Sequence, residues 1–284
     1  MNNSRALSRR HFLRNSLRAS AFLAGCAPCG VSLAADTDKQ DRGLKLGVTT
    51  YTLRKFSLDE AISMTKEANL RYISLKEMHL PLKSTREQRK EAHNKIKAAG
   101  LTLMGGGVIY MKNSEEEIRN AFDYAKDAGM PTIICSPEPE ALPIVEKFAK
   151  EYDIHIAIHN HGPGDKRYPS PFDVLRMVDK MDRRMGLCID VGHTVRIGDD
   201  PVAAITKSAK RLFDFHMKDV NAATPEGEPV EVGKGVIDIP AVLKALLQIK
   251  YRYHVALEYE AHADDPMPGV KGSIVYIRQA LQRA

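Results

Sequence analysis

The sequence predicts an α/β protein that folds as a closed (β/α)₈ barrel, or TIM barrel, in a single domain over residues 44–284. From residue 45 onward, apolar strand-like runs alternate with amphipathic helical stretches, eight times in about 240 residues. Such alternation implies a parallel sheet, and eight units of this length fit a closed barrel of about 250 residues. A doubly wound open sheet is the alternative, but it usually carries a glycine fingerprint after the first strand. In this chain that turn reads Tyr51-Thr52-Leu53-Arg54.

Local signals define the first four strand–helix units. Ser57, with Glu60 three residues later, forms a capping box ahead of the first helix, and Gly100 ends the second helix. The third strand contains Gly105-Gly106-Gly107, which allows a neighbouring backbone to approach closely. We expect strands over 45–53, 71–78, 101–109 and 131–136, followed by helices over 57–69, 85–99, 114–129 and 139–152.

The second half of the chain repeats this pattern. Its sixth strand begins apolar at Gly186 and ends on Asp190, Gly192 and His193. A longer loop with Gly233-Lys234-Gly235 follows the seventh strand and is either a flexible connection or a segment that covers substrate or binds phosphate. We expect strands over 154–160, 186–193, 212–218 and 253–259, and helices over 171–181, 201–210, 239–250 and 272–283.

A basic leader precedes the barrel. Residues 1–34 contain five arginines and no Asp, Glu or Lys, so without them the net charge of +6 falls to about +1, and we expect no nucleic-acid partner. Arg9-Arg10 followed by Phe12-Leu13, an apolar stretch and a small-residue site at Ala34 resemble a twin-arginine signal peptide. The expected location is therefore the periplasm. An ordinary secretory leader or a disordered basic tail is the alternative, and the apolar stretch is too short and interrupted for a transmembrane helix.

The cysteines bear on anchoring and on redox state. Leu23-Ala24-Gly25-Cys26 resembles a lipoprotein cleavage box, so lipid anchoring through Cys26 is the alternative to cleavage near Ala34. We favour Ala34, because the residues after Cys26 are still apolar. Cys135 and Cys188 lie in strand-like runs and are expected to be small core residues without a disulfide.

Histidines and acidic residues follow several predicted strands, at the point where each strand ends. In a barrel of this kind the chemistry sits at this C-terminal face. A lone histidine on a strand is usually a core residue, but four consecutive strands ending on such groups favour a shared site. The ends read His159-Asn160-His161, Asp190 with His193, His216-Met217-Lys218-Asp219 and Glu258-Tyr259-Glu260, and the second strand ends in Lys76-Glu77-Met78-His79.

Mixed histidine and carboxylate ligands suit one divalent metal ion such as Mn²⁺, Co²⁺, Fe²⁺ or Zn²⁺. Strand residues two apart share a face. On that count Ala256, Glu258 and Glu260 point into the barrel. Asp190 shares a strand face with Cys188, and His216 shares one with Asp214 and Lys218.

On these residues the chain resembles the xylose isomerase-like barrels, also called sugar phosphate isomerases/epimerases, from about Leu44 to the C-terminus. The resemblance is most specific in 186–193, 216–219 and 257–260. It implies one divalent metal held by residues of strands five to eight. By position, Asp190, His216 and Glu258 correspond to the last three ligands, and His193 to a substrate contact.

The fifth strand departs from the family pattern. Where many of the family's epimerases place a glutamate, this chain has His159. His159 could be a fourth metal ligand, or His159 or His161 could act as the catalytic base. In a third alternative, three residues and water hold the metal. Histidine-rich fifth strands resemble the inosose dehydratases and 3-keto-glycoside lyases, which carry out β-elimination.

The resemblance implies an isomerase or epimerase acting on a small-molecule sugar or keto-sugar through an enediolate, which a base forms by removing an acidified C–H proton. Lyase or dehydratase chemistry is the runner-up. Oligomer formation is left open. The expected catalytic residues are Glu258, Glu260, His161 and Lys218, and the expected substrate contacts are His193, His79, Lys76, Glu77 and Arg196. With no Trp, stacking on a sugar would use Tyr51, Tyr110 or Phe215.

Two other classes remain as alternatives. A non-catalytic sugar-binding barrel would have a pocket without a metal. A phosphodiesterase of the endonuclease IV type would need more metal-binding residues and a basic surface, and the nearly neutral charge after residue 34 argues against it.

Overall fold

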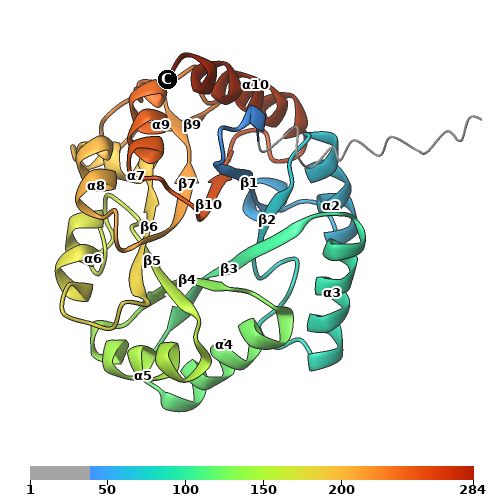
Figure 1. Cartoon of the computed structure of the whole chain (residues 1–284), viewed down its shortest axis with the longest axis vertical. Helices are drawn as coiled ribbons and strands as arrows, with labels where there is room; N and C mark the ends of the chain where they lie inside the picture. Colours follow the sequence, from blue (N-terminus) through green and yellow to red (C-terminus); the bar gives the residue numbers. More distant parts are fainter. Residues whose placement is uncertain (1–38) are drawn as a thin grey trace, which may run out of the picture. The chain divides into compact units, whose positions relative to one another are not determined.

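Eight apolar runs pair side by side as parallel strands and close into a barrel in the computed structural model, which describes residues 39–284 (Figure 1). Each strand neighbours the next one along the chain, and β1 closes the ring against β10. The closed (β/α)₈ barrel is confirmed. The leader and Cys26 lie outside the described residues. The barrel strands are β1 (Lys45–Thr49), β2 (Tyr72–Leu75), β3 (Thr102–Met111), β4 (Thr132–Pro137), β5 (His155–His159), β6 (Met185–Asp190), β7 (Leu212–Met217) and β10 (His254–Leu257).

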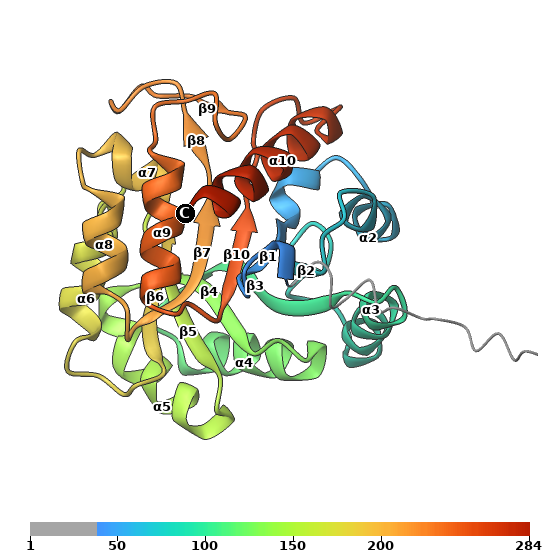
Figure 2. The same cartoon turned by 45° about the horizontal axis from the view of Figure 1, so that its top comes forward.

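Helices surround the strand ring on its outside (Figures 1 and 2). The predicted capping box starts α2, where the Ser57 hydroxyl accepts from Glu60 N and Glu60 Oε2 accepts from Ser57 N at 2.7 Å. Gly129, with φ of 70°, ends α4. The helices are α2 (Leu58–Glu67), α3 (Arg86–Ala98), α4 (Glu115–Ala128), α5 (Leu142–Tyr152), α6 (Pro171–Val178), α7 (Val191–Arg196), α8 (Pro201–Lys207), α9 (Ile239–Gln248) and α10 (Met267–Arg283).

The strands are buried on both faces, as parallel strands generally are. Their outward side chains, such as Val255 and Leu257, join a large apolar core beneath the helices. Inside the ring lies a small apolar cluster of Ile134, Ala157, Cys188 and Phe213. Cys135 and Cys188 are buried free thiols, as predicted.

The glycine run in β3 lies against β4, as its composition predicts. A side chain at Gly107, where φ is 136°, would bring its Cβ within 1.9 Å of the Ile134 carbonyl oxygen. A Cβ at Gly105 would lie 2.8 Å from the Thr132 carbonyl oxygen. The run is therefore required for the close approach of these strands.

Several boundaries differ from the prediction, and four of them bear on how the chain folds around the barrel. β1 continues as the 3₁₀ helix η1 (Thr50–Leu53), and β2 ends at Leu75 before a turn. The end of the predicted sixth strand is instead α7, which forms because Asp190 Oδ1 accepts a hydrogen bond from His193 N at 2.9 Å. Helix α10 begins at Met267, before two glycines that suggest a helix break, because Val270 and Ile274 pack into the core.

The long loop after β7 contains a small hairpin that the sequence does not predict. Strands β8 (Asp219–Val220) and β9 (Pro229–Val230) pair antiparallel beyond the C-terminal end of β7 (Figure 2). Asp219 organises the loop, because its two carboxylate oxygens accept backbone N–H bonds of 2.9–3.2 Å from Val220, Gly233, Gly235 and Ile237. These glycine N–H groups point at Asp219, which argues against a phosphate-binding loop there.

Among residues 39–284, no helix combines the length and the apolar character that crossing a bilayer requires.

Candidate metal-binding active site

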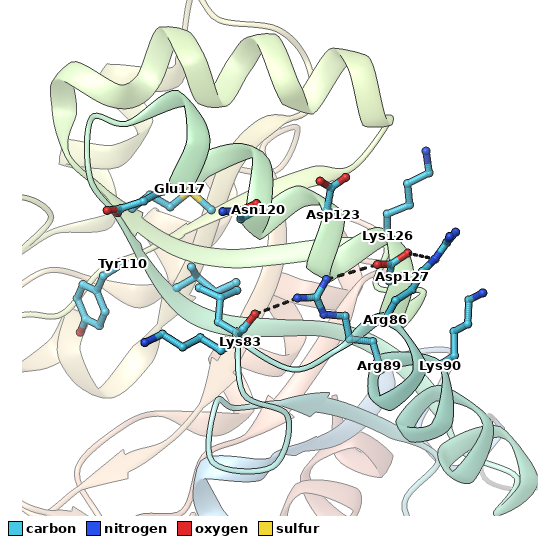
Figure 3. Close-up of a pocket in the computed structure, with 13 residues that line it drawn as sticks. Lys83, Arg86, Arg89, Lys90, Tyr110, Glu117, Asn120, Asp123, Lys126 and Asp127 are labelled. Atoms are coloured by element: carbon cyan, nitrogen blue, oxygen red, sulfur yellow. Dashed lines mark hydrogen bonds and ion pairs between the residues drawn. The ribbon is translucent and has the colours of Figure 1, made fainter.

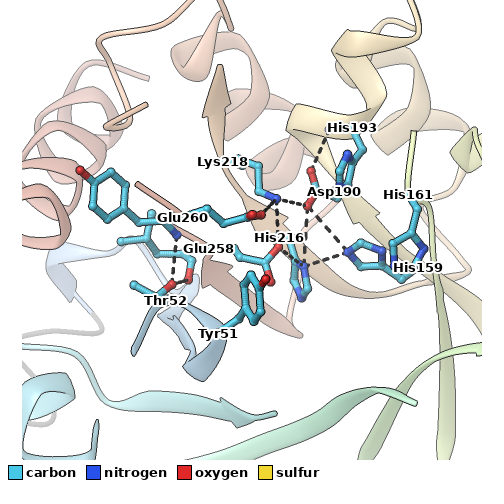
Figure 4. Close-up of polar contacts among 12 residues, drawn as sticks. Tyr51, Thr52, His159, His161, Asp190, His193, His216, Lys218, Glu258 and Glu260 are labelled. Carbon is cyan, nitrogen blue, oxygen red and sulfur yellow. Dashed lines mark hydrogen bonds and ion pairs between the residues drawn. The ribbon is translucent and has the colours of Figure 1, made fainter. Parts of the chain in front are cut away.

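Four buried side chains from adjacent barrel strands meet at the C-terminal mouth (Figure 4). His159, Asp190, His216 and Glu258 each offer a donor atom, and these atoms lie within 4.8 Å of one another. His159 Nε2 lies 3.0 Å from His216 Nδ1, which lies 3.2 Å from Glu258 Oε2. The register explains this convergence, since Asp190 pairs with His216 across β6 and β7, and Ala256 pairs with His216 across β10 and β7.

The donor atoms fit a divalent metal ion. Asp190 Oδ2 is buried and faces the Lys218 ammonium at 3.0 Å and His159 Nε2 at 3.7 Å. The ring nitrogens of His159 and His216 face each other, so they share either one proton or one cation. A set of two imidazoles and two carboxylates suits Mn²⁺, Fe²⁺, Co²⁺ or Zn²⁺.

The protonation states also suit a metal. Burial keeps the pKa of His159 well below its usual value, so the imidazole is neutral. Burial alone would raise the pKa of Asp190, but Lys218 and His193 bring it well below its usual value. Burial alone would also raise the pKa of Glu258, but Lys76 and Lys218 bring this pKa well below its usual value. Neutral imidazoles and ionised carboxylates are the forms that bind metal.

Lys218 lies beside these ligands. Its Nζ is 3.0 Å from Asp190 Oδ2 and 3.1 Å from Glu258 Oε2, and it also pairs with Glu260. Burial lowers the pKa of Lys218, but the three carboxylates raise it well above its usual value. Lys76 Nζ lies 3.1 Å from Glu258 Oε1. Three carboxylates thus face two ammonium groups, which leaves an excess of negative charge for a further cation.

A second layer lies one step deeper in the barrel. Asp214 Oδ1 is 3.5 Å from His216 Nε2 and 3.6 Å from Cys188 Sγ, and Asp214 Oδ2 is 3.8 Å from His254 Nδ1. Burial raises the pKa of Asp214 to about 6. A carboxylate beside Nε2 favours the tautomer with its proton there, which leaves the Nδ1 lone pair facing the cluster. This role is not among the sequence predictions, although Asp214 stands two residues before His216 on one strand face.

A pocket of about 360 Å³ opens over the cluster. It brings the predicted substrate and catalytic residues Lys76, Glu77, His161, His193 and Glu260 together with His159 and Glu258. Burial lowers the pKa of His161 and of His193, so both imidazoles are neutral at pH 7 and able to accept a proton. The remaining walls are Tyr51, Met78, Val108 and Tyr110.

Three residues expected to contact substrate lie elsewhere. His79 Nε2 faces the Phe56 carbonyl at 3.1 Å, and His79 lines a separate surface pocket. Arg196 donates to the Pro225 carbonyl at 2.5 Å and meets the mouth only through His193 Nδ1, 3.4 Å away. Phe215 is fully buried in the core beneath the helices, so it cannot stack on a sugar. The turn after β2 positions His79, the C-terminal end of α7 positions Arg196, and the outward face of β7 positions Phe215.

A larger surface groove, of about 1130 Å³, runs between α3 and α4 (Figure 3). Asp127 pairs there with Arg86 at 3.0 Å and with Arg89 at 3.4 Å. Of the residues that line the mouth pocket, the groove shares Tyr110. Because the titratable and ligand groups converge in the smaller pocket, we place the candidate site there rather than in the groove.

The fold and the site together define the class of protein: a (β/α)₈ barrel with a candidate metal-binding site at the C-terminal ends of its strands. Residues 62–280 match the Xylose isomerase-like TIM barrel family, and the chain belongs to this family. It is 29% identical to the rhizopine catabolism protein MocC of Rhizobium meliloti over 140 residues. This stretch covers 44% of this chain and 42% of that protein. It is 26% identical to an inosose dehydratase of Clostridium beijerinckii over 130 residues. This stretch covers 40% of this chain and 43% of that protein. The match therefore spans less than half the length of each.

Solved structures share the fold. The IOLI protein, solved with a bound zinc atom, superposes with a TM-score of 0.73 at 16% identity and covers 84% of this chain and 99% of that chain. An L-ribulose 3-epimerase gives a TM-score of 0.69 at 15% identity and covers 84% of this chain and 95% of that chain.

Proposed function

We propose that the protein is a divalent-metal-dependent enzyme that acts on a sugar or keto-sugar through an enediolate, as an isomerase or epimerase. The observation that carries this proposal is the cluster of His159, Asp190, His216 and Glu258, whose donor atoms lie within 4.8 Å at the base of an open pocket. The epimerase and the zinc-bound protein among the structural relatives are consistent with it.

A divalent ion held by these residues would polarise a carbonyl–hydroxyl pair of the substrate and acidify the neighbouring C–H. The protein supplies the proton acceptors. Figure 4 places Glu260 and His161 at opposite ends of the cluster. A carboxylate and a neutral imidazole on either side of a bound substrate could each take or return a proton. The buried ammonium of Lys218 would stabilise the oxyanion that forms.

Lyase or dehydratase chemistry by β-elimination is the second candidate, and the histidines of the fifth strand favour it. The two faces of the site are chemically unequal, with Glu260 at one end and His161 at the other. One group could then remove the C–H proton while Lys218 or His161 protonates a departing oxygen. The inosose dehydratase among the sequence relatives agrees with this alternative.

Incubation with free ketoses and 3-keto-glucosides in D₂O tests the proposal. Deuterium incorporation into recovered sugar with all bonds retained supports the isomerase or epimerase. Release of water or of the group attached to the sugar supports the lyase. Binding with neither reaction would support a non-catalytic sugar-binding barrel. Asp190→Asn, which keeps the side-chain shape, serves as the inactive control.

We also propose export through the arginine-rich leader, with the barrel folded around its metal before transport. The Arg9-Arg10 pair and the residues after it support this proposal. Cell fractionation of the wild type and of an R9K/R10K variant tests it. We expect the variant to stay in the cytoplasm, and equal export of both proteins would contradict twin-arginine transport.

A further inference from the structure

The two sides of the mouth differ in polarity. Imidazoles and carboxylates come from β5, β6, β7 and the end of β10. On the side of β2 and β3, Lys76 and Glu77 are followed by the apolar or aromatic side chains of Met78, Val108 and Tyr110. Met78 is 48% exposed and Tyr110 is 65% exposed at this second side. Val108 and Ile109 at the end of β3 are also partly exposed. Apolar surface left open beside a polar site is a mark of a binding surface.

A side pocket of about 130 Å³ extends the mouth in this direction. It shares three wall residues with the mouth pocket, namely Glu77, Val108 and Tyr110. Its other walls are Leu80, Leu82, Gly107, Ile109 and Tyr124.

The lining of the side pocket selects for an apolar group. The Tyr124 hydroxyl donates to the Leu80 carbonyl at 2.9 Å, so its polar end is already satisfied and its ring remains as wall. The volume is close to that of an apolar cavity of about 150 Å³ that holds benzene. Glu77 at the shared rim disfavours an anionic group. A neutral aryl ring or a small branched alkyl group therefore fits.

Tyr110 connects this pocket to the proposed proton-transfer groups. Its ring lies against the His161 ring, with 5.9 Å between centroids and 27° between planes. The Tyr110 hydroxyl is 3.3 Å from His161 Nε2. Tyr110 therefore lies beside His161 and also forms part of the wall of both the mouth pocket and the side pocket.

We infer that the substrate is a keto-sugar or keto-polyol that carries a neutral apolar substituent, and that this substituent binds in the side pocket. The inference rests on the proposed function, because the polar ring is assigned to the mouth pocket above the metal-site residues. It narrows the substrate class from a free ketose to a derivative with an aryl or alkyl appendage.

The test compares kcat/KM for phenyl and methyl 3-keto-β-D-glucoside in the wild type, in Leu82→Trp and in Met177→Trp. Leu82 lines the side pocket and the groove between α3 and α4 but not the mouth pocket, so a Trp there narrows the side pocket and leaves the walls of the mouth pocket unchanged. Met177 is 38% exposed on α6 and is the matched control. We expect a preference of about tenfold or more for the phenyl compound in the wild type and in the control. The preference should fall to about one in Leu82→Trp, in keeping with the loss of the apolar pocket. Equal kcat/KM for both compounds in the wild type would overturn the inference, as would an unchanged preference in a folded Leu82→Trp protein.

A binding measurement keeps the inference independent of turnover and of the folding of the variant. Calorimetry with phenyl and methyl β-D-glucoside uses unreactive probes on the wild-type protein. Tighter binding of the phenyl compound supports the side pocket, and equal binding contradicts it. If neither keto-glucoside reacts while the phenyl compound still binds more tightly, the enzymatic proposal fails and the side pocket stands.

Discussion

At the scale of single residues, the site depends on which atoms face one another. His159 illustrates this dependence, because the fifth strand carries histidine where the resemblance suggests glutamate. The structure places His159 Nε2 3.7 Å from Asp190 Oδ2 and 3.0 Å from His216 Nδ1. His159 therefore lies where a metal ligand would lie, among the other three ligand residues. The rim position suited to a catalytic base belongs to His161.

Replacing His159 with Asn should therefore weaken metal binding. An amide oxygen is a poorer ligand than imidazole for divalent transition metals such as Co²⁺ and Zn²⁺, and we expect the affinity to fall by about 10-fold to 100-fold. Titration of metal-free protein with Co²⁺, followed by its visible absorption, measures the change. If His159→Asn binds Co²⁺ as the wild type does, the ligands are the other three residues and water.

Asp214 should act on the metal through His216. The Asp214→Asn variant keeps the shape of the side chain but loses the charge that holds the proton on His216 Nε2. We expect metal affinity to fall by about 10-fold to 100-fold, as is typical when such a partner is removed. Metal affinity measured from pH 6 to 8 checks this effect, with Cys188→Ala as the control for simple disturbance of the neighbouring packing. An affinity unchanged from the wild type would show that Asp214 serves the barrel interior alone.

At the scale of elements, the sequence predicts the repeating units better than their ends. Apolar periodicity and caps such as Ser57 with Glu60 act locally, so the strands and most helices are confirmed. Helix α7 and the β8–β9 hairpin depend on side chains that bond to backbone several residues away. Asp190 acts as a helix cap as well as a proposed ligand, and this double use is not visible from its place at a strand end.

The loop after β7 should lose order when Asp219 is replaced with Ala. Four backbone N–H groups would lose their acceptor, and we expect a loss of about 2–4 kcal/mol in the free energy of unfolding. Urea unfolding measures the loss, and hydrogen exchange at Gly233, Gly235 and Ile237 locates it. Asp238→Ala is the matched control, because Asp238 accepts one backbone N–H, from Ala241, and its loss should cost about 1 kcal/mol. Equal effects of the two variants would contradict the organising role of Asp219.

At the scale of the whole molecule, barrel closure brings together residues that are distant along the chain. Strand alternation predicts that Glu258 points into the barrel, and its place in the buried cluster agrees with that prediction. The polarity of the whole mouth does not follow from any single strand. Sequence position alone assigns His79, Arg196 and Phe215 to substrate. The turn after β2, the end of α7 and the outward face of β7 direct these side chains elsewhere.

The stability of the metal-free protein should fall as the pH falls below 6.5. Burial, with smaller contributions from His216 and Lys45, lowers the pKa of His254 to about 3, so the unfolded chain binds a proton between pH 6.5 and 3 that the folded chain does not. This difference costs about 2 kcal/mol at pH 5. Asp214 has the opposite sign, because its folded pKa of about 6 lies above its unfolded value, and it offsets part of the loss.

Urea unfolding at pH 7.5, 6.0 and 5.0 in the presence of chelator measures this dependence. His254→Gln should be less sensitive to pH than the wild type, because the titrating imidazole is removed. Greater stability at pH 5.0 than at pH 7.5 would contradict the assignment of a buried neutral histidine.

The metal content of protein purified without chelator tests the central claim most directly. We predict about one divalent ion per chain in the wild type and in the surface control Asp238→Asn, and about none in Asp190→Ala and His216→Ala. Elemental analysis of the folded proteins gives the ratio. A wild type without metal, or an Asp190→Ala protein that retains the full complement, would contradict a metal-dependent active site at this mouth.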